Sequence, residues 1–298
     1  MSRKGWLLFG SLCVIWGIPY LLIRVAVREL PPPSLVFLRT APTALLLVPL
    51  AARRGQLRPL LPRWRWILAF AAAELAVPWL MLSHAEERMS SSMAGLMIAA
   101  VPLIGAVLYP MVSHSERLGT RRLAGLVIGF AGVAALVGID ASDTSALSIV
   151  EVGITALGYA LGPLIISRRL ADLPSLGVIA VSITLTAVLY APFGIATMPA
   201  SLSGEVIASV ATLALVCTAA AFLIFFALIL EVGPSRSTVI TYINPLVAVL
   251  LGVLLLGEPF TVGIAVGLPL IVVGSLLATS RAVPRPEAEA GESVSLPS

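Results

Sequence analysis

Long runs without a charged residue recur along the whole chain. Six of these runs approach or exceed the roughly 20 apolar residues that a helix needs to cross the hydrocarbon of a bilayer. They lie at 5–23, 89–113, 123–139, 206–230, 237–257 and 259–280. Four further stretches qualify if isolated charges are allowed: 34–52 with Arg39, 64–83 with Arg65 at its edge and Glu74 inside, 147–166 with Glu151, and 175–197. The pattern predicts an all-α integral membrane protein with about ten transmembrane helices.

The composition agrees with this pattern. Of the 298 residues, 59% are hydrophobic and only 11% are charged, whereas soluble domains are usually about 45–50% apolar. The basic N-terminus and the apolar run after it resemble a signal peptide. No clear small-x-small cleavage site follows, so we interpret this segment as the first helix.

The positions of the basic residues predict the orientation. Short cytoplasmic loops are enriched in Lys and Arg, and fifteen of these residues fall on the N-terminus, the even-numbered loops with their edges, and the tail. We therefore expect a multi-pass protein of the cytoplasmic (inner) membrane, with both termini cytoplasmic. Because this asymmetry explains the basic pI, we expect the lipid bilayer as a partner and no nucleic acid. The polar tail 281–298 is expected to be disordered.

The two halves of the chain resemble each other. Gly17 matches Gly158 and the tripeptide PSL at 33–35 matches PSL at 174–176, both at an offset of 141 residues. Glu116 matches Glu258 at an offset of 142. We expect two five-helix repeats, 1–140 and 141–280. Because five is odd, the second repeat should be inverted in the membrane, as in many secondary transporters.

A matched pair of prolines falls within two of the predicted spans. Pro102 aligns with Pro245 at an offset of 143 residues. Proline lacks an N–H, so the carbonyls of Ile98 and Thr241 lose their helical partners. We therefore predict that both helices are weakened at matched places, which makes the two prolines candidate hinges.

Several motifs resemble those of the EamA-type proteins in the drug/metabolite transporter superfamily. They are Trp16-Gly17, the Pro-rich loop before Phe37–Arg39, Pro245, and Gly257-Glu258-Pro259, and the resemblance covers the chain apart from the tail. It implies ten helices with both ends cytoplasmic, a central cavity between the halves, and export of small metabolites such as amino acids.

Glu74 and Arg39 are charges placed well inside predicted spans, where an unpaired charge is costly. Glu74 could titrate a proton or bind an ammonium group, or it could be a structural partner for Arg39 or a backbone group. Arg39 could hold a substrate carboxylate by a bidentate contact, or it could serve helix packing or an ion pair. We favour this structural role.

Trp16, Tyr20 and Arg24 follow each other at spacings of four residues, which places them on one face of a regular helix. This stripe could line a cavity for an amphipathic substrate. The alternative is an interhelical contact made close by Gly17. Because Trp16 lies mid-span, away from the interfacial belt that tryptophan prefers, we favour the cavity.

Three more polar residues are candidates for substrate contact. Tyr242 and Asn244 point about 200° apart on a regular helix, so only one could face the cavity unless Pro245 distorts the turn. Asn244 could instead satisfy backbone groups beside the proline. Tyr159, next to the repeat-matched Gly158, is a further cavity candidate.

Other polar residues are expected to have structural or solvated roles and no part in substrate binding. Arg24 and Glu151 lie within about a turn of the outer face, where their side chains can reach the interface. His84 and His114 are isolated near helix ends, and no metal-ligand spacing surrounds either. Glu116 and Glu258 are interpreted as caps or anchors.

Together these features favour a secondary transporter that moves a small metabolite by alternating access. We find no HExxH, GxSxG or paired intramembrane aspartates, so we expect no catalytic residues and no enzyme activity. The only lysine is Lys4, which excludes a Walker A motif, and no cofactor or metal is expected. The alternative is a membrane scaffold or sensor. The sequence leaves the substrate, coupling ion, direction and oligomeric state open.

Overall fold

The computed structural model describes residues 2–113, 119–139, 145–233, 237 and 239–279, and every regular element in these ranges is a helix. Nine helical stretches of the described chain are long and apolar enough to cross a membrane, and one shorter apolar helix, α14 (Ile240–Leu256), accompanies them. The prediction of an all-α membrane protein with about ten spans is confirmed. His114, Glu116 and the tail 281–298 lie outside the described residues.

Several spans contain more than one helical segment. The first half of the chain contains α1 (Arg3–Ile15), α2 (Pro19–Ala26), α3 (Pro32–Arg53), the 3₁₀ turn η1 (Arg58–Arg63), α4 (Trp64–Phe70), the π-helical turn η2 (Ala71–Ala76), α5 (Val77–Ala85), α6 (Ser91–Ile98), α7 (Val101–Ser113) and α8 (Thr120–Ile139). The second half contains α9 (Ala146–Ile165), the π turn η4 (Ile166–Leu170), α10 (Ser175–Ala196), α11 (Gly204–Ala214), the π turn η5 (Leu215–Ala220), α12 (Ala221–Val232), α14 and α15 (Val262–Thr279).

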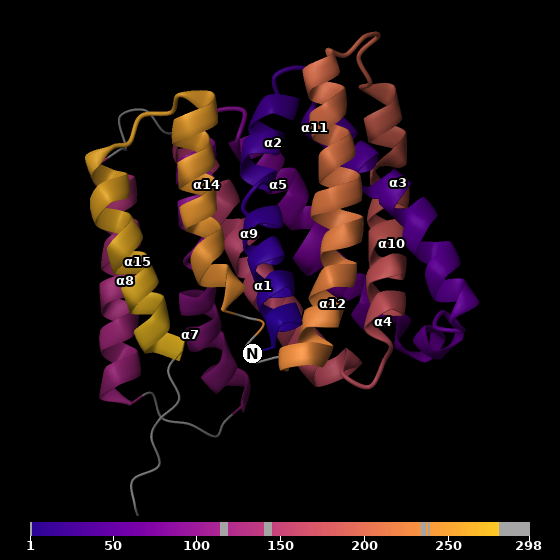
Figure 1. Cartoon of the computed structure of the whole chain (residues 1–298), viewed down its shortest axis with the longest axis horizontal. Coiled ribbons are helices and arrows are strands. Elements are labelled where there is room, and N and C mark those ends of the chain that lie inside the picture. Colours follow the sequence, from indigo (N-terminus) through magenta and orange to yellow (C-terminus); the bar gives the residue numbers. More distant parts are fainter. Residues whose placement is uncertain (1, 114–118, 140–144, 234–236, 238, 280–298) are drawn as a thin grey trace, which may run out of the picture.

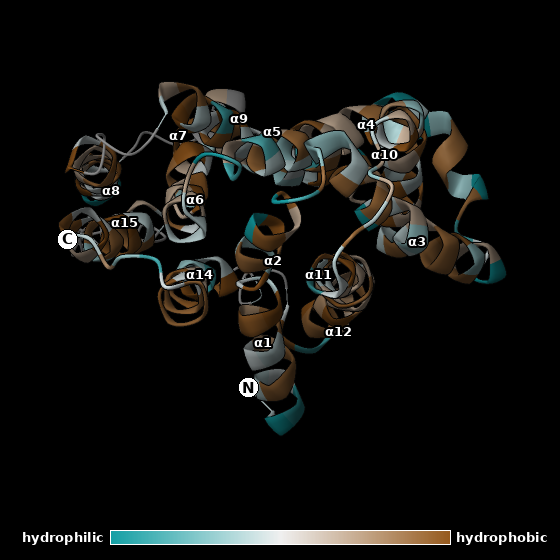
Figure 2. Ribbon diagram, turned by 90° about the horizontal axis from the view of Figure 1, so that it is seen from above, coloured by the Kyte–Doolittle hydropathy of each residue, from teal (hydrophilic) through white to brown (hydrophobic). Residues whose placement is uncertain are grey.

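Helices that correspond in the two halves pack against each other. α3 packs against α10, α6 against α14, and α8 against α15; Figures 1 and 2 show the α3–α10 and α8–α15 pairs at opposite ends of the bundle. The contact of α5 with α9 has its counterpart in the contacts of α11 with α2 and α12 with α1. Two matched five-helix halves predict this order. Their inverted relation and the boundaries at 140 and 280 stay predictions.

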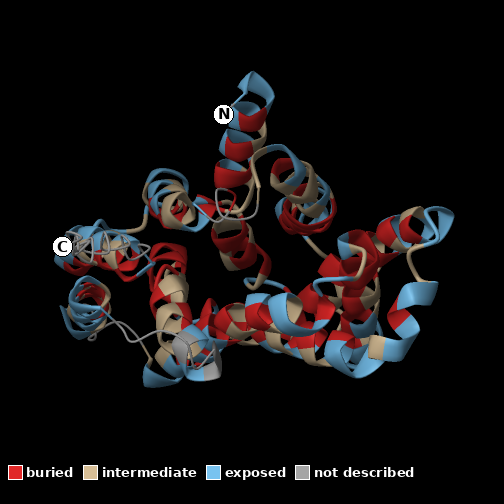
Figure 3. Ribbon diagram, turned by 90° about the horizontal axis from the view of Figure 1, so that it is seen from below, coloured by how far each residue is buried: buried red, intermediate tan, exposed pale blue. Residues whose placement is uncertain are grey.

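The helices consist mainly of hydrophobic residues, and most hydrophilic residues lie near helix ends and in the connecting loops (Figure 2). Large apolar side chains such as Leu45, Leu230 and Leu254 are strongly exposed, and the exposed faces lie on the periphery (Figure 3). Such a surface would be an aggregation hazard in water, whereas lipid tails solvate it well. The described chain is therefore built as a multi-pass membrane protein.

The α8–α15 pair is held together by glycines on both helices. A Cβ atom added to Gly274 of α15 would overlap the backbone of Gly129 and lie 2.7 Å from the carbonyl oxygen of Gly125. A Cβ atom on Gly267 would lie 3.0 Å from the carbonyl oxygen of Gly132. Small residues of this kind let membrane helices approach closely. Packing within one chain therefore accounts for these glycines.

The first span is broken, although the uninterrupted apolar run 5–23 predicts one helix. α1 ends at Ile15 and α2 begins at Pro19, with a turn over residues 16–18 between them. The physical reason is Pro19, which has no N–H to donate to the carbonyl of Ile15.

The two matched prolines sit in different local structures. Before Pro102 the helix is interrupted: α6 ends at Ile98 and α7 begins at Val101. The carbonyl oxygen of Ala99, at this interruption, accepts a hydrogen bond of 3.3 Å from the hydroxyl of Ser275 on α15. In contrast, α14 continues through Pro245 without a break. The hinge role of either proline stays a prediction.

The close glycine contact between α8 and α15, which we call the glycine seam, can be tested by adding one methyl group. Gly274→Ala should lower the free energy of unfolding in detergent by about 1–3 kcal/mol, because the new methyl group meets backbone that cannot move aside. The control is Gly153→Ala in α9, since nothing lies within 4 Å of a Cβ at Gly153 and alanine favours the helix by up to about 1 kcal/mol. Equal effects of the two substitutions on thermal unfolding would contradict the seam.

Candidate functional site

Arg39 lies inside the bundle, on α3, and only 7% of the residue is exposed. Its Nε donates a hydrogen bond of 3.0 Å to the hydroxyl of Thr218. Its guanidinium carbon lies 3.8 Å from the centre of the Trp79 ring, in the geometry of a cation–π contact. Arg39 thus links α3 to two other spans, one from each half. This arrangement supports the packing role, while a substrate role stays a prediction.

The partner of Arg39 belongs to a π-helical turn. Thr218 is the fourth residue of η5, and its hydroxyl donates to the carbonyl oxygen of Leu213 at 2.7 Å. The same oxygen atom therefore donates into the widened turn and accepts from Arg39. π-helical turns frequently occur at functional sites.

Glu74 is the fourth residue of the corresponding π turn, η2, in the first half. No ion pair joins Glu74 to Arg39 in the described structure, and the enclosed Oε2 of Glu74 has no hydrogen-bond partner there. The carboxyl group lies directly over Gly162 of α9, where any Cβ atom would overlap it. Gly162 thus makes room for Glu74. Glu74 is not a structural ion-pair partner of Arg39.

The helix assumed for the stripe of Trp16, Tyr20 and Arg24 is interrupted. The turn over residues 16–18 separates Trp16 from the other two, so the spacing argument, which needs a continuous helix, is wrong here. The ring of Trp16 contacts Phe225 and Phe222, with centroid distances of 4.9 and 6.1 Å. Trp16 therefore packs against α12, which supports the interhelical alternative. Whether it contacts substrate stays a prediction.

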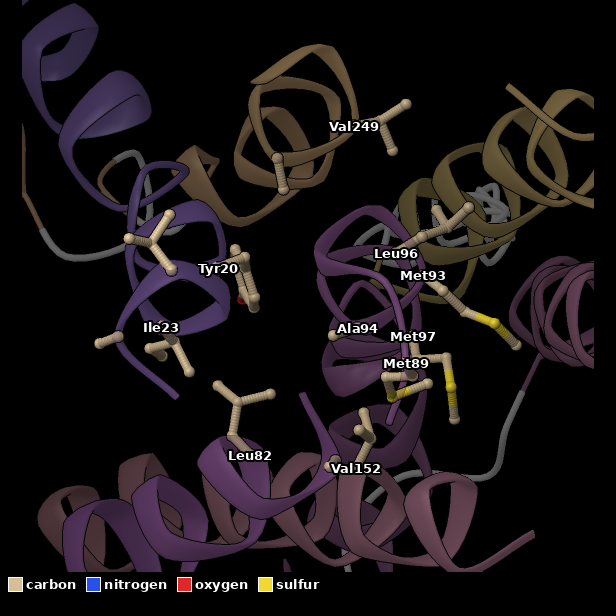
Figure 4. Packing of buried hydrophobic residues seen from close by; sticks show 14 of the residues in the cluster. Tyr20, Ile23, Leu82, Met89, Met93, Ala94, Leu96, Met97, Val152 and Val249 are labelled. Carbon is tan, nitrogen blue, oxygen red and sulfur yellow. The ribbon is translucent and has the colours of Figure 1, made fainter. Parts of the chain in front are cut away.

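Tyr20 and Tyr159 reach the interior from different halves. Tyr20 is buried, and its side chain points from α2 toward α6 (Figure 4), where Gly95 leaves room for the ring. Tyr159 of α9 is half-buried, and its hydroxyl lies near the side chain of Trp79. Because Trp79 also contacts Arg39, the Tyr159 hydroxyl and the Arg39 guanidinium share one neighbour.

Tyr242 and Asn244 lie away from this group. The hydroxyl of Tyr242 forms a hydrogen bond of 2.5 Å with the hydroxyl of Thr279, at the end of α15. The side-chain amide of Asn244 can donate to two carbonyl oxygens, at 3.0 Å from Ile240 and 3.2 Å from Cys13. Asn244 thus serves backbone groups near Pro245 and joins α14 to α1, which is the alternative to substrate contact. The structure does not bring either residue together with Arg39.

A separate apolar groove runs along the side of the bundle. It has a volume of about 310 Å³ and is lined mainly by residues of α3 and α11, all apolar: Leu38, Pro42, Leu202, Ile207, Val210, Ala211, Ala214 and Leu215. None of the candidate site residues lines it. The groove offers no polar group that could orient a polar solute.

The comparisons with known proteins agree with this architecture. The model of the EamA-like transporter family matches the chain twice, over residues 3–138 and 148–280. The chain belongs to the EamA-like transporter family. It is therefore a multi-pass membrane transporter.

Relatives of this EamA-like transporter cover nearly the whole chain. The "Uncharacterized inner membrane transporter YedA" of Escherichia coli K12 is 31% identical over 91% of this chain and 90% of its own length. The "Uncharacterized transporter YvbV" of Bacillus subtilis is 23% identical over 92% and 91%. A solved crystal structure with 22% identity shares the fold, with a TM-score of 0.66 over 94% of this chain and 97% of that one.

The Gly257-Glu258-Pro259 segment makes a contact between the halves. Gly257 ends α14 with φ +66°, a conformation that favours glycine, and Glu258 follows. The Glu258 carboxylate accepts hydrogen bonds of 2.5–3.0 Å from the N–H and hydroxyl groups of Ser91 and Ser92, at the N-terminus of α6. A helix N-terminus favours a negative charge. The interpretation of Glu258 as a cap is confirmed.

Sequence reasoning was wrong about Glu151 and His84. Glu151 is buried and does not reach the interface; it contacts the Nδ1 atom of His84, and its Oε2 lies 3.4 Å from Nη2 of Arg88. His84 is therefore paired and not isolated. The residues are 63 to 67 positions apart in the chain, so only the packing of α5 against α9 brings them together.

Sequence reasoning also missed Glu86, which is completely buried directly after α5. Both of its carboxyl oxygens are enclosed and lack a hydrogen-bond partner among the described residues. The only signal in the sequence was that Glu86 follows the largely apolar segment 75–85. A glutamate in that position looks like an ordinary loop residue.

The link between Arg39 and the second half can be measured by a double-mutant cycle. Arg39→Lys keeps the charge but loses the Nε hydrogen bond and the planar stacking on Trp79, and Thr218→Val removes the acceptor. Each should cost about 1–3 kcal/mol of unfolding free energy, with a coupling of about 1 kcal/mol or more between them.

The control for this cycle pairs Arg39→Lys with Thr186→Val. Thr186 is also a buried threonine, but its hydroxyl bonds only within its own helix, to the carbonyl of Ser182. This pair should be additive. Additivity of Arg39→Lys with Thr218→Val as well would show that the hydrogen bond between Arg39 and Thr218 contributes nothing to stability.

Proposed function

We propose that this EamA-like protein is a secondary transporter that moves a small, amino-acid-like or amphipathic organic solute across the cytoplasmic membrane by alternating access. The observation that carries the proposal is the enclosed polar group between the halves. It combines a cation, hydroxyls and aromatic rings: Arg39, Thr218, Trp79, Tyr20 and Tyr159. A scaffold has no need of such groups in its interior, where they are costly to place.

The contacts between the halves are suited to rearrangement. Arg39–Thr218 and Glu258–Ser91/Ser92 are polar contacts that join one half to the other, and water entering a path could replace them. The interruption between α6 and α7 offers a point at which a span can bend. In this mechanism the halves rock about the enclosed polar group, with Pro102 and Pro245 as hinge positions.

Orientation and direction are part of the same proposal. α1 begins and α15 ends on the same face of the bundle (Figure 1). The excess of Lys and Arg on the N-terminus, the even-numbered loops and the tail supports a cytoplasmic position for that face. Export is the direction that the family resemblance favours. A membrane scaffold or sensor is the alternative, and it would move no solute.

The proposal predicts solute movement in proteoliposomes. We expect uptake or efflux of at least one member of a radiolabelled amino-acid and amine panel by the purified protein. A pH gradient should drive it if Glu74, which has an enclosed and unpartnered oxygen, exchanges a proton during the cycle, and Glu74→Gln should then abolish the driving effect.

The control is Glu205→Gln, which alters a carboxylate at a surface ion pair with Arg28. It should leave transport unchanged. Transport that is indifferent to both the gradient and Glu74→Gln would assign Glu74 a structural role and make the protein a facilitator. Absence of protein-dependent movement across the panel, with correctly folded protein, would favour the scaffold or sensor.

A further inference from the structure

Glu86 is the one carboxyl group in the described structure with both oxygens enclosed and unpartnered. It directly follows Ala85, the last residue of the third span, and none of its surface is exposed. The N–H of Glu86 donates to the carbonyl of Leu82, so the residue sits at the C-terminal end of α5. A helix C-terminus disfavours a negative charge. The local backbone therefore gives the ionised carboxylate no support.

The charged neighbours of Glu86 are occupied elsewhere. Arg24 of α2 donates from Nη1 to the backbone oxygen of Glu86, and the carboxyl group receives no such bond. Arg39 of α3 is engaged with Thr218 and Trp79. The carboxylate of Glu258, which follows α14, is taken by the two serines at the start of α6. Among the described residues, no basic side chain forms an ion pair with the Glu86 carboxyl group.

The remaining titratable groups around Glu86 are two tyrosines and its own sequence neighbours. Tyr20 of α2 and Tyr159 of α9 are close enough for the charge of Glu86 to act on their hydroxyls. On its own segment, His84 and Arg88 contact Glu151, and Glu87 lies 3.8 Å from His84. Those side chains form a separate cluster with Glu151 of α9.

This environment favours the neutral or cation-bound form of the carboxyl group. Burial and then the negative charge of Glu258 raise the pKa of Glu86 well above the ordinary glutamate value, while Arg24 and Arg39 offset only part of this effect. An enclosed carboxylate without a hydrogen-bond donor is strongly unfavourable. A proton or a donating cation removes that cost.

We propose that Glu86 is an exchangeable cation site in the translocation path, at which the carboxyl group takes either a proton or the N–H group of a solute ammonium. The site lies at the end of α5, beside Arg24 of α2. The Glu258 carboxylate and the hydroxyls of Tyr20 and Tyr159 are close enough to interact electrostatically with it. Its role in coupling rests on the proposed transport function. The binding of a cation at Glu86 does not rest on that function and can be measured without transport.

The first test is infrared difference spectroscopy of the full chain in lipid nanodiscs between acidic and alkaline pH. It uses a Glu74→Gln background, so that the other described carboxyl group with an enclosed and unpartnered oxygen is removed. We expect a C=O stretching band of a protonated carboxyl group that disappears in Glu86→Gln and shifts in Glu86→Asp. The matched control, Glu87→Gln, should keep the band. A band that persists in Glu86→Gln, or no such band at all, overturns the proposal.

The second test follows stability against pH. The raised pKa means that the folded state binds the proton more tightly than the unfolded chain does. Ionisation therefore opposes folding, and this destabilisation grows as pH rises from the unfolded glutamate pKa of about 4.3 toward the raised folded value. Glu86→Gln should remove that part of the decline in Tm, and Glu87→Gln should not. Identical pH profiles for Glu86→Gln and wild type overturn the proposal.

Two salts then distinguish the sources of the cation. Methylammonium chloride carries N–H donors, whereas tetramethylammonium chloride at the same concentration has none. If methylammonium removes the Glu86 infrared band and tetramethylammonium does not, the site binds ammonium groups as well as protons. A band that neither salt changes assigns it to the proton alone. If the band is present but proteoliposomes move no solute, the transport function fails and the cation site stands.

Discussion

A charge or a free backbone group inside a bilayer must find its partner within the protein, because the hydrocarbon offers neither water nor donors. Most of the polar contacts inside this bundle follow from that constraint. They satisfy the ends and interruptions of helices, or they hold a buried charge. Many also join the two halves: Arg39–Thr218, Glu258–Ser91, Asn244–Cys13 and Ser275–Ala99. The requirement that buried polar groups find partners within the protein therefore also ties the halves together. The unpartnered carboxyl group of Glu86 is an exception to it.

The two halves share their architecture but differ in chemistry. Both third spans contain a π-helical turn, and the fourth residue of each turn is polar. In the second half this residue is Thr218, which is neutral and fully bonded. In the first half it is Glu74, which has an unpartnered oxygen. A duplicated fold keeps its backbone because the packing of paired helices requires it, whereas individual side chains are free to diverge into asymmetric roles.

Much of the fold could be predicted from the sequence. The length of the apolar runs gives the spans, and the spacing of Gly17, Pro102 and Glu258 with their counterparts indicates the repeat. The candidate site was predicted only in part. Arg39 and Glu74 stood out because each is a charge within an apolar segment. The stripe through Trp16 failed because a spacing argument assumes a continuous helix, which Pro19 interrupts.

The sequence by itself determined which segments lie in the membrane and which residues there are costly to bury, because both follow from local hydrophobicity. Only the tertiary structure decided how those costs are met. The pairing of Glu151 with His84, the cap that Glu258 forms on α6, and the enclosure of Glu86 all join residues that are distant in the chain or packed from several helices. A solvated loop glutamate and an enclosed one look the same in a sequence, since the difference is made by what folds around them.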